Sequence, residues 1–201
     1  MKKIDIFPTS IYDFQNDAID NQDIIKKLEK ETLREHTALS SLEDLHTKDG
    51  FDHLFSWFEE CLEEIRQEMR YDCDKIAITS SWCNKQYANS GMFHSPHKHS
   101  MSMWSGVYYC TPGAPTCFQD PVTQRTEAQI EVLQFDFSPF EYVDAKPGRL
   151  IVFPSWMFHS TTRSTEGVDR WSIAFNTFPE GKINYKIARD SVITLKVGNP
   201  Q

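Results

Sequence analysis

The sequence has no run of apolar residues that approaches the roughly 20 needed for a helix to cross a bilayer, so we expect no membrane partner. It also lacks a basic excess, because 21 lysines and arginines stand against 29 aspartates and glutamates, for a formal net charge of -8. Phosphates repel a chain of this charge, so we expect no nucleic-acid partner. The two lysines near the start precede no apolar segment, which argues against a signal peptide.

Paired cysteines are absent as well. The five cysteines form an odd, scattered set without a Cys-x-x-Cys spacing. Such a set is typical of reduced thiols in a cytoplasmic protein, and it favours neither a disulfide framework nor a cysteine-ligated zinc site. We therefore expect a cytoplasmic location. The cysteines are Cys61, Cys73, Cys83, Cys110 and Cys117.

The length of 201 residues is that of one domain with a sizeable core. We expect a single domain over residues 1–201. Helical support is expected at about 20–70, and a β core is expected at about 75–178.

The first third of the chain carries helical patterns. In residues 51–70 apolar side chains recur at steps of three and four, with acidic residues on the other side. Residues 22–34 show a similar stripe, with Asn21 or Asp23 as the candidate cap. Residues 4–13 are expected to form an edge strand broken by a proline, and residues 37–50 a polar loop with at most a short helical turn.

From residue 75 onward, short β-favouring runs alternate with turns rich in proline and glycine. Residues 122–146 are expected to be irregular, either as a lid or binding loop or as a surface excursion. Short strands at this spacing predict a mainly β fold, an antiparallel sandwich or barrel of the jelly-roll kind. The expected strands are 76–82, 105–110, 116–118, 149–153, 158–162 and 170–176, with a further one at 192–197.

Three of the seven histidines fall within the heptapeptide Phe-His-Ser-Pro-His-Lys-His at 93–99. His97 and His99 are two residues apart, so on a strand they face the same side and offer two neutral nitrogen ligands to a transition metal. A third histidine from another strand, His159, would complete one face of the metal and leave the other open, as a catalytic metal requires. The alternative is a surface pair or a hydrogen-bonded core pair without metal.

The expected strand at 170–176 alternates between a polar face and an aromatic face. Arg170, Ser172, Ala174 and Asn176 share the polar face, which suits the wall of a pocket. The planar fork of an arginine in a pocket matches a carboxylate with two parallel hydrogen bonds, and Ser172 could donate a third. A surface salt bridge is the alternative for Arg170.

These residues resemble the iron(II)- and 2-oxoglutarate-dependent oxygenases. In that family a His-x-Asp/Glu pair and a distant histidine bind iron, and a later arginine or lysine binds the far carboxylate of 2-oxoglutarate. His97-Lys98-His99, His159 and Arg170-Trp171-Ser172 stand in those places. The resemblance covers about residues 4–178 and implies a double-stranded β-helix fold, Fe(II) at the three histidines, and 2-oxoglutarate as co-substrate.

The chain looks most similar to the prolyl-hydroxylase-like branch. There, a tyrosine before the first ligand and the second tyrosine of a Tyr-Tyr strand commonly help to hold the co-substrate, and Tyr87 and Tyr109 match them. Phe175-Asn176 also resembles a motif of a subgroup of such oxygenases. The resemblance thus implies that Arg170, Ser172, Tyr87, Tyr109 and Asn176 bind the co-substrate.

Position 99 departs from the family pattern, because a histidine replaces the carboxylate. Three imidazoles carry one negative charge less than the family's ligand set, so they are expected to hold iron more weakly. Asp120 could supply a carboxylate if its loop folded inward, and the sequence leaves this open. His94, three residues before His97, is expected to face away from the metal, beside the ligands or at the entrance.

The resemblance implies an oxygenase that oxidises a C–H bond of a small-molecule or peptide substrate and releases succinate and CO2. The first alternative is a cupin-like three-histidine dioxygenase that uses no 2-oxoglutarate. The second is a non-catalytic jelly-roll binding module. The sequence carries no signal for the identity of the substrate or for the oligomeric state.

Overall fold

The computed structural model describes residues 8–35, 38–121, 139–186 and 191–198. Helices α1 (Asn21–Leu28) and α2 (Asp52–Glu68), with the short 3-10 helix η1 (Leu45–Thr47) between them, come early in the chain. The strands are β1 (Tyr12–Gln15), β2 (Arg34–Glu35), β3 (Leu39–Ser40), β4 (Lys75–Gln86), β5 (Trp104–Tyr109), β6 (Gly113–Gln119), β7 (Phe140–Ala145), β8 (Arg149–Pro154), β9 (His159–Thr161), β10 (Arg170–Ile183) and β11 (Ile193–Leu195).

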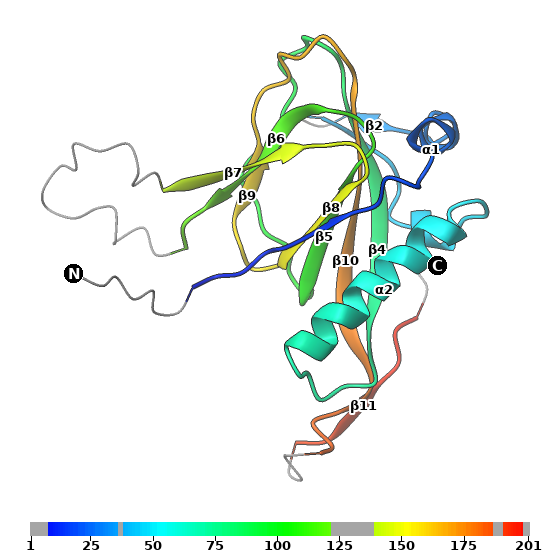
Figure 1. Ribbon diagram of the computed structural model, residues 1–201, viewed down its shortest axis with the longest axis vertical. Helices are drawn as coiled ribbons and strands as arrows, with labels where there is room; N and C mark the ends of the chain where they lie inside the picture. The colour runs from blue at the N-terminus through cyan, green and yellow to red at the C-terminus, as the bar shows by residue number, and fades with distance from the viewer. Residues whose placement is uncertain (1–7, 36–37, 122–138, 187–190, 199–201) are drawn as a thin grey trace, which may run out of the picture.

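Within the described ranges the strands form two antiparallel sheets. The larger has eight strands in the order β1-β8-β5-β10-β4-β3-β2, with β11 added to β10, and the smaller has the order β7-β6-β9. Figure 1 shows α2 lying across the larger sheet, over β4 and β10, with the smaller sheet on the far side of β5 and β8. This arrangement confirms the predicted mainly β, double-stranded β-helix fold.

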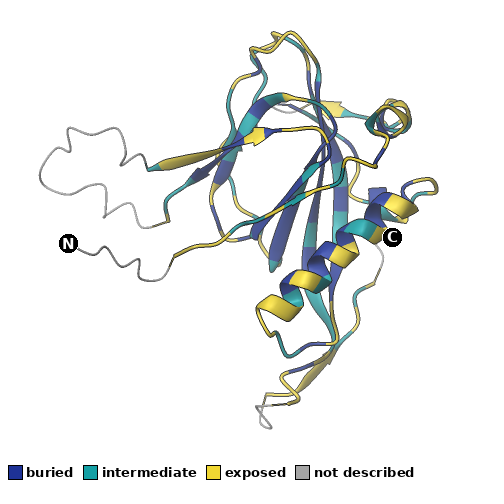
Figure 2. Ribbon diagram, in the orientation of Figure 1, coloured by how far each residue is buried: buried dark blue, intermediate teal, exposed yellow. Residues whose placement is uncertain are grey.

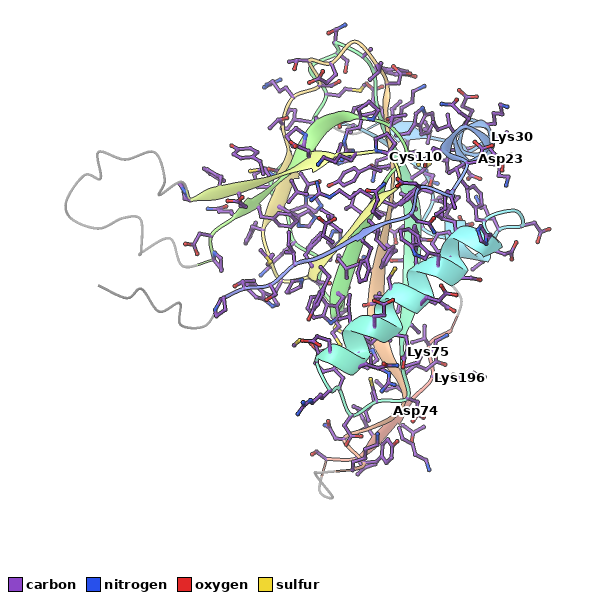
Figure 3. The ribbon with its side chains drawn as sticks, viewed as in Figure 1. Asp23, Lys30, Asp74, Lys75, Cys110 and Lys196 are labelled. Atoms are coloured by element: carbon purple, nitrogen blue, oxygen red, sulfur yellow. The ribbon has the colours of Figure 1, made fainter. Side chains whose placement is uncertain are left out.

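The strands β4 and β10 form a long ribbon that extends beyond the smaller sheet (Figure 1). At its end Asp74 accepts a hydrogen bond from the backbone N of Lys182 at 2.8 Å, and β11 pairs with β10 there. Figure 3 labels Asp74 and Lys75 at this end of the molecule. Among the described residues, no helix has the length and apolar character needed to cross a membrane.

Helix α2 lies within the range predicted for it and covers the outer face of the larger sheet. Figure 2 shows its buried face toward the sheet and its exposed face toward solvent. The ring of Phe58 lies 5.2 Å from that of Phe175 on β10 and 5.5 Å from that of Tyr108 on β5. The periodic apolar residues therefore join helix and sheet in one core. The buried residues of α2 are Leu54, Phe55, Phe58, Cys61, Leu62 and Ile65.

Gly106 on β5 occupies the tightest position of this core, because a Cβ there would lie 2.2 Å from Cζ of Phe175. The ring of Phe175 is fully buried and cannot move aside freely. We expect Gly106→Ala to lower the free energy of unfolding by about 1–3 kcal/mol in urea denaturation. Gly167→Ala is the matched control, since a Cβ at Gly167 meets no atom within 4 Å. Equal stability of the two variants would contradict this packing.

Several predicted boundaries were wrong. Helix α1 ends at Leu28 and not at residue 34, and its cap is Asp20, whose carboxylate accepts the backbone N–H of Gln22 and Asp23. The short helical turn allowed in the expected loop at 37–50 is η1, but the loop also contains strand β3, which was not predicted. Because β2 and β3 have two residues each, they are too short to show a periodic pattern.

The expected irregular segment at 122–146 contains strand β7, so the prediction was wrong for residues 140–145. The signal was present, because Val143 and Ala145 alternate with exposed residues along this strand. Residues 122–138 of that segment lie outside the described ranges. The proline-broken strand expected at 4–13 is also misplaced, since β1 begins at Tyr12, while residues 1–7 lie outside the described ranges.

Candidate metal centre and binding cavity

A cavity of about 630 Å³ lies between the two sheets. Its wall is built by β4, β5, β8 and β10 of the larger sheet, by β6 and β9 of the smaller sheet, and by the histidine loop and residues 40–44. This volume falls within the range of roughly 300–1,000 Å³ that is usual for small-molecule sites.

Three histidines converge on this cavity. His97, His99 and His159 each present one ring nitrogen, and these atoms lie within 4.8 Å of one another. Nε2 of His99 and Nε2 of His159 are 3.3 Å apart. Two nitrogens bound at right angles to one ion, each about 2.1 Å from it, are about 3 Å apart. The spacing therefore suits two ligands of a single metal ion, and the structure brings together all three histidines that the sequence indicated.

The histidine loop is not the strand that the sequence predicted. His97 forms an isolated bridge with His159, in which each backbone N–H donates to the carbonyl of the other residue at 3.0 and 2.9 Å. The backbone N–H of His99 donates to the carbonyl of Ser155 at 3.0 Å. These three bonds hold the loop against β9 and the residue that follows β8, so that its histidines converge without a continuous strand.

Two of the imidazoles are oriented by backbone carbonyls. Nδ1 of His97 lies 2.7 Å from the carbonyl of Ser95, and Nδ1 of His159 lies 3.0 Å from the carbonyl of Met157. A carbonyl only accepts, so the proton is on Nδ1 in both rings and Nε2 keeps its lone pair for a metal. Burial, followed by the neighbouring His97, lowers the pKa of His159 to about 3 and that of His99 to about 4. Both rings are therefore neutral at pH 7, which ligation requires.

Arg170 is only 2% exposed and lines the same cavity. Its Nε donates to the carbonyl of Ala114 and its Nη1 to Oγ of Ser172, each at 2.9 Å. Among the described residues it has no carboxylate partner, and Nη2 makes no hydrogen bond. Burial lowers the pKa of Arg170. Burying a cation without a counter-ion costs free energy, and an anion bound in the cavity beside this guanidinium would offset that cost.

The other residues predicted to hold a co-substrate divide into two groups. Ser172 lines the cavity beside Arg170. The ring of Tyr109 lies 5.4 Å from the guanidinium carbon of Arg170, and its hydroxyl is 2.6 Å from Oγ1 of Thr116, which lines the cavity. Tyr109 thus supports this end of the cavity from behind.

Tyr87 and Asp120 are not brought to this end of the cavity. Tyr87 is 45% exposed, does not line the cavity, and has the ammonium of Lys85 4.7 Å from its ring centroid. Asp120 lines a separate hollow of about 220 Å³ between β6 and β7. Among the described residues, His99 and not Asp120 therefore completes the group of candidate ligands. Asn176 contacts His99, with Nδ2 3.4 Å from its Nδ1.

His94 lines the cavity, so the expectation that it faces away was wrong. That expectation assumed a strand, whereas the loop turns. Its backbone N–H donates to Oγ1 of Thr161 at 2.8 Å, and its carbonyl accepts the N–H of Thr161 at 3.1 Å. Its Nε2 is buried and has no hydrogen-bond partner among the described residues. Burial, followed by Arg170 and His97, lowers the pKa of His94 to about 3, so the ring is neutral.

The part of the wall at residues 40–44 was not predicted, because these residues follow no periodic pattern. Asn84 on β4 also lines the cavity, with Oδ1 accepting from Oγ of Ser40 at 2.7 Å. Trp82 closes the wall near the metal site, with its ring 5.6 Å from that of His99. Trp82 and Asn84 could have been considered as wall residues from the sequence, because both lie on the mostly buried strand β4.

Residues 80–176 match a family model described as "Putative 2OG-Fe(II) oxygenase". No curated protein matches the chain.

Solved structures of similar fold include HygX from Streptomyces hygroscopicus with nickel, 2-oxoglutarate and hygromycin B bound, at 12% identity and TM-score 0.60, covering 85% of this chain and 83% of that one. A prolyl-4-hydroxylase from Pseudomonas putida is 13% identical with TM-score 0.59, covering 86% and 94%. The non-heme alpha-ketoglutarate-dependent epimerase SnoN from nogalamycin biosynthesis is 8% identical with TM-score 0.64, covering 96% and 90%. At these identities the likeness shows a shared fold.

Proposed function

Since residues 80–176 match the family model of 2OG-Fe(II) oxygenases, we propose that this chain is an Fe(II)- and 2-oxoglutarate-dependent oxygenase. In the proposed reaction 2-oxoglutarate and O2 are consumed, one oxygen atom enters succinate as CO2 is released, and the other enters a C–H bond of the substrate. One observation carries the proposal: a buried guanidinium without a described carboxylate partner lines the same cavity as three converging imidazoles.

The proposed iron ligands are Nε2 atoms of His97, His99 and His159. Support comes from their spacing and from the carbonyls that leave Nε2 of His97 and His159 unprotonated. Iron bound there would supply the redox chemistry with oxygen. The three histidines would hold the metal from one part of the cavity wall and would leave room beside it for the co-substrate.

We propose that Arg170 binds the far carboxylate of 2-oxoglutarate. Nη2 is free of hydrogen bonds to described residues, and Oγ of Ser172 lies 2.9 Å from Nη1, so both can face one carboxylate. A dianionic ligand also neutralises the buried positive charge. Tyr109 and Thr116 would hold the guanidinium and the adjacent wall in place.

The chain would also keep water from the reacting atoms. The ring of Phe153 lies 4.6 Å from that of His159, and Phe118 lies 6.2 Å from it. Trp82 covers His99 from β4. These apolar rings restrict access to the metal site on the side of the core and strengthen the electrostatic interactions inside the cavity.

The resemblance to prolyl hydroxylases favours a small molecule or a peptide side chain as the substrate. We further propose a single domain, because α1, α2 and the larger sheet share one hydrophobic core. The cytoplasm is the proposed location, since all five cysteines are free, buried thiols.

The proposal predicts succinate formation by the iron-loaded protein. Protein loaded anaerobically with Fe(II) is mixed with 2-oxoglutarate and oxygen, and succinate and CO2 are measured. We expect both products in equal amounts, at a slow uncoupled rate that requires the metal and 2-oxoglutarate. A three-histidine dioxygenase, which the imidazole at position 99 would also suit, predicts oxygen uptake without 2-oxoglutarate. Firmly bound zinc without either reaction would favour a non-catalytic binding module.

A further inference from the structure

Asn176 lies directly behind His99. It stands on β10 between Ser80 of β4 and Ser105 of β5, at the point where the register of β10 against β4 shifts. Its Nδ2 is 3.4 Å from Nδ1 of His99 and 3.4 Å from Oγ of Ser80. A register shift of this kind commonly re-aims a side chain near a functional site. Here it accompanies an amide that faces an imidazole.

His99 differs from the other two histidines in the group that faces its Nδ1. The carbonyls that face His97 and His159 can only accept a hydrogen bond. The side-chain amide that faces His99 can either donate or accept, depending on which end it presents. The orientation of this amide therefore decides which nitrogen of His99 carries the proton.

In the structure, Oδ1 of Asn176 accepts a hydrogen bond from Oγ of Ser105 at 2.8 Å, so that Nδ2 faces His99. Nδ1 of His99 must then accept, and the proton is on its Nε2. That proton can be donated to Nε2 of His159 at 3.3 Å, which has a free lone pair. This arrangement is consistent in itself, but a metal at Nε2 of His99 requires the other tautomer.

Rotating the amide of Asn176 by 180° gives that tautomer, because Oδ1 then faces Nδ1–H of His99 and Nδ2 donates to Ser105. Oxygen and nitrogen of an amide occupy nearly equal space, so the rotation needs only that hydroxyl protons turn, with no shift of other heavy atoms. Oγ of Ser105 is 2.8 Å from Oγ of Ser155, and that atom is 2.7 Å from Oγ of Ser102. Oγ of Ser102 donates to the carbonyl of Trp104 at 3.1 Å, and this carbonyl accepts the last hydrogen bond of the series of hydroxyls.

Every group in this series has a hydrogen-bond partner in either orientation of the Asn176 amide, because each serine hydroxyl can donate and accept. We propose that Asn176 is the positioning residue of His99. Its side-chain carbonyl accepts the Nδ1 proton when Nε2 binds a metal, and Oγ of Ser105, the first hydroxyl of the series, then accepts a hydrogen bond from its Nδ2. The inference rests on the metal site of the proposed function and not on 2-oxoglutarate chemistry.

The role can be tested by metal affinity, with Zn(II) or Co(II) titrated against a chromophoric chelator. We expect Asn176→Ala to weaken metal binding by about 10- to 100-fold, the usual effect of losing the group that orients a ligand. Asn176→Asp should restore binding to the wild-type level or better, because a carboxylate accepts the Nδ1 proton in either orientation. The visible spectrum of the Co(II)-loaded protein should change in the alanine variant and not in the aspartate variant.

The matched control is Asn21→Ala, which removes another amide that accepts a hydrogen bond, from Tyr108 at 2.7 Å, within the helical layer. It should leave metal affinity unchanged. Ser105→Ala leaves Asn176 in place and should weaken binding in the same direction by less, which covers the case of an alanine variant that does not fold.

Wild-type affinity in a folded Asn176→Ala or Ser105→Ala protein would overturn the inference, as would an aspartate variant that binds no better than alanine. A wild-type protein that binds no divalent metal would instead refute the proposed function.

Discussion

Arg170→Met is expected to weaken binding of 2-oxoglutarate to the metal-loaded protein by about 100- to 1,000-fold. Two hydrogen bonds to a charged carboxylate contribute roughly 1.5–3 kcal/mol each, so we expect a loss of about 3–4 kcal/mol in binding free energy. A loss of this size corresponds to a dissociation constant raised by about 100- to 1,000-fold. Methionine fills a similar volume without the charge or the donors. The dissociation constant is measured calorimetrically with Ni(II) at the site, so that no turnover is needed.

The same variant should leave the stability of the ligand-free protein unchanged within about 1 kcal/mol, or raise it. Arg170 has no described carboxylate partner, so its removal relieves the cost of burying a charge, while the carbonyl of Ala114 loses one donor. Metal affinity should also be unchanged. Arg163→Ala, which removes an exposed arginine near Phe93, is the control and should not alter 2-oxoglutarate binding. Full affinity in Arg170→Met would show that the anion binds elsewhere.

His159→Ala is expected to abolish stoichiometric metal binding. Two imidazoles would remain, so the loss should exceed the roughly 10- to 100-fold effect of losing an orienting partner. His159 also takes part in the backbone bridge with His97, but that bridge uses main-chain atoms and survives the substitution. The measurement is metal content after dialysis against a defined free metal concentration.

Stability has to be separated from ligation in this variant, because the ring of His159 packs on Phe153. Thermal unfolding in the presence of a chelator reports the packing loss alone, and we expect about 1–3 kcal/mol. His53→Ala, which removes an exposed histidine on α2, is the matched control for metal content. If His159→Ala retained one metal per chain with wild-type affinity, the three-histidine site would be wrong.

Local pattern was a reliable guide wherever it repeated over several residues. Helix α2 shows its apolar stripe over 17 residues, and β10 alternates with Trp171, Ile173 and Phe175 in the core behind the cavity. Strands of two residues, such as β3, have no period to detect. Strand β7 was missed although its alternation is visible, because exposed aromatic residues interrupted the expected apolar run.

The candidate site shows the same division. His97, His99, His159 and Arg170 could be selected from residue type and spacing, since the antiparallel connections between strands limit where they can lie. His94 and Tyr87 were misjudged because their positions depend on how loops turn. His94 lies in a loop and its backbone N–H donates to the hydroxyl of Thr161, while the exposed ring of Tyr87 lies beside the ammonium of Lys85.

Composition, periodicity and spacing were enough to predict a mainly β, acidic protein whose imidazoles and guanidinium could share one cavity. Three features became visible only in the folded chain: Arg170 has no carboxylate partner among the described residues, Asp120 lines another hollow, and Asn176 faces His99. Alternation and charge are properties of neighbouring residues and can be read along the chain. Partnership between polar groups depends on strand register and loop turns, which bring distant residues within hydrogen-bond distance.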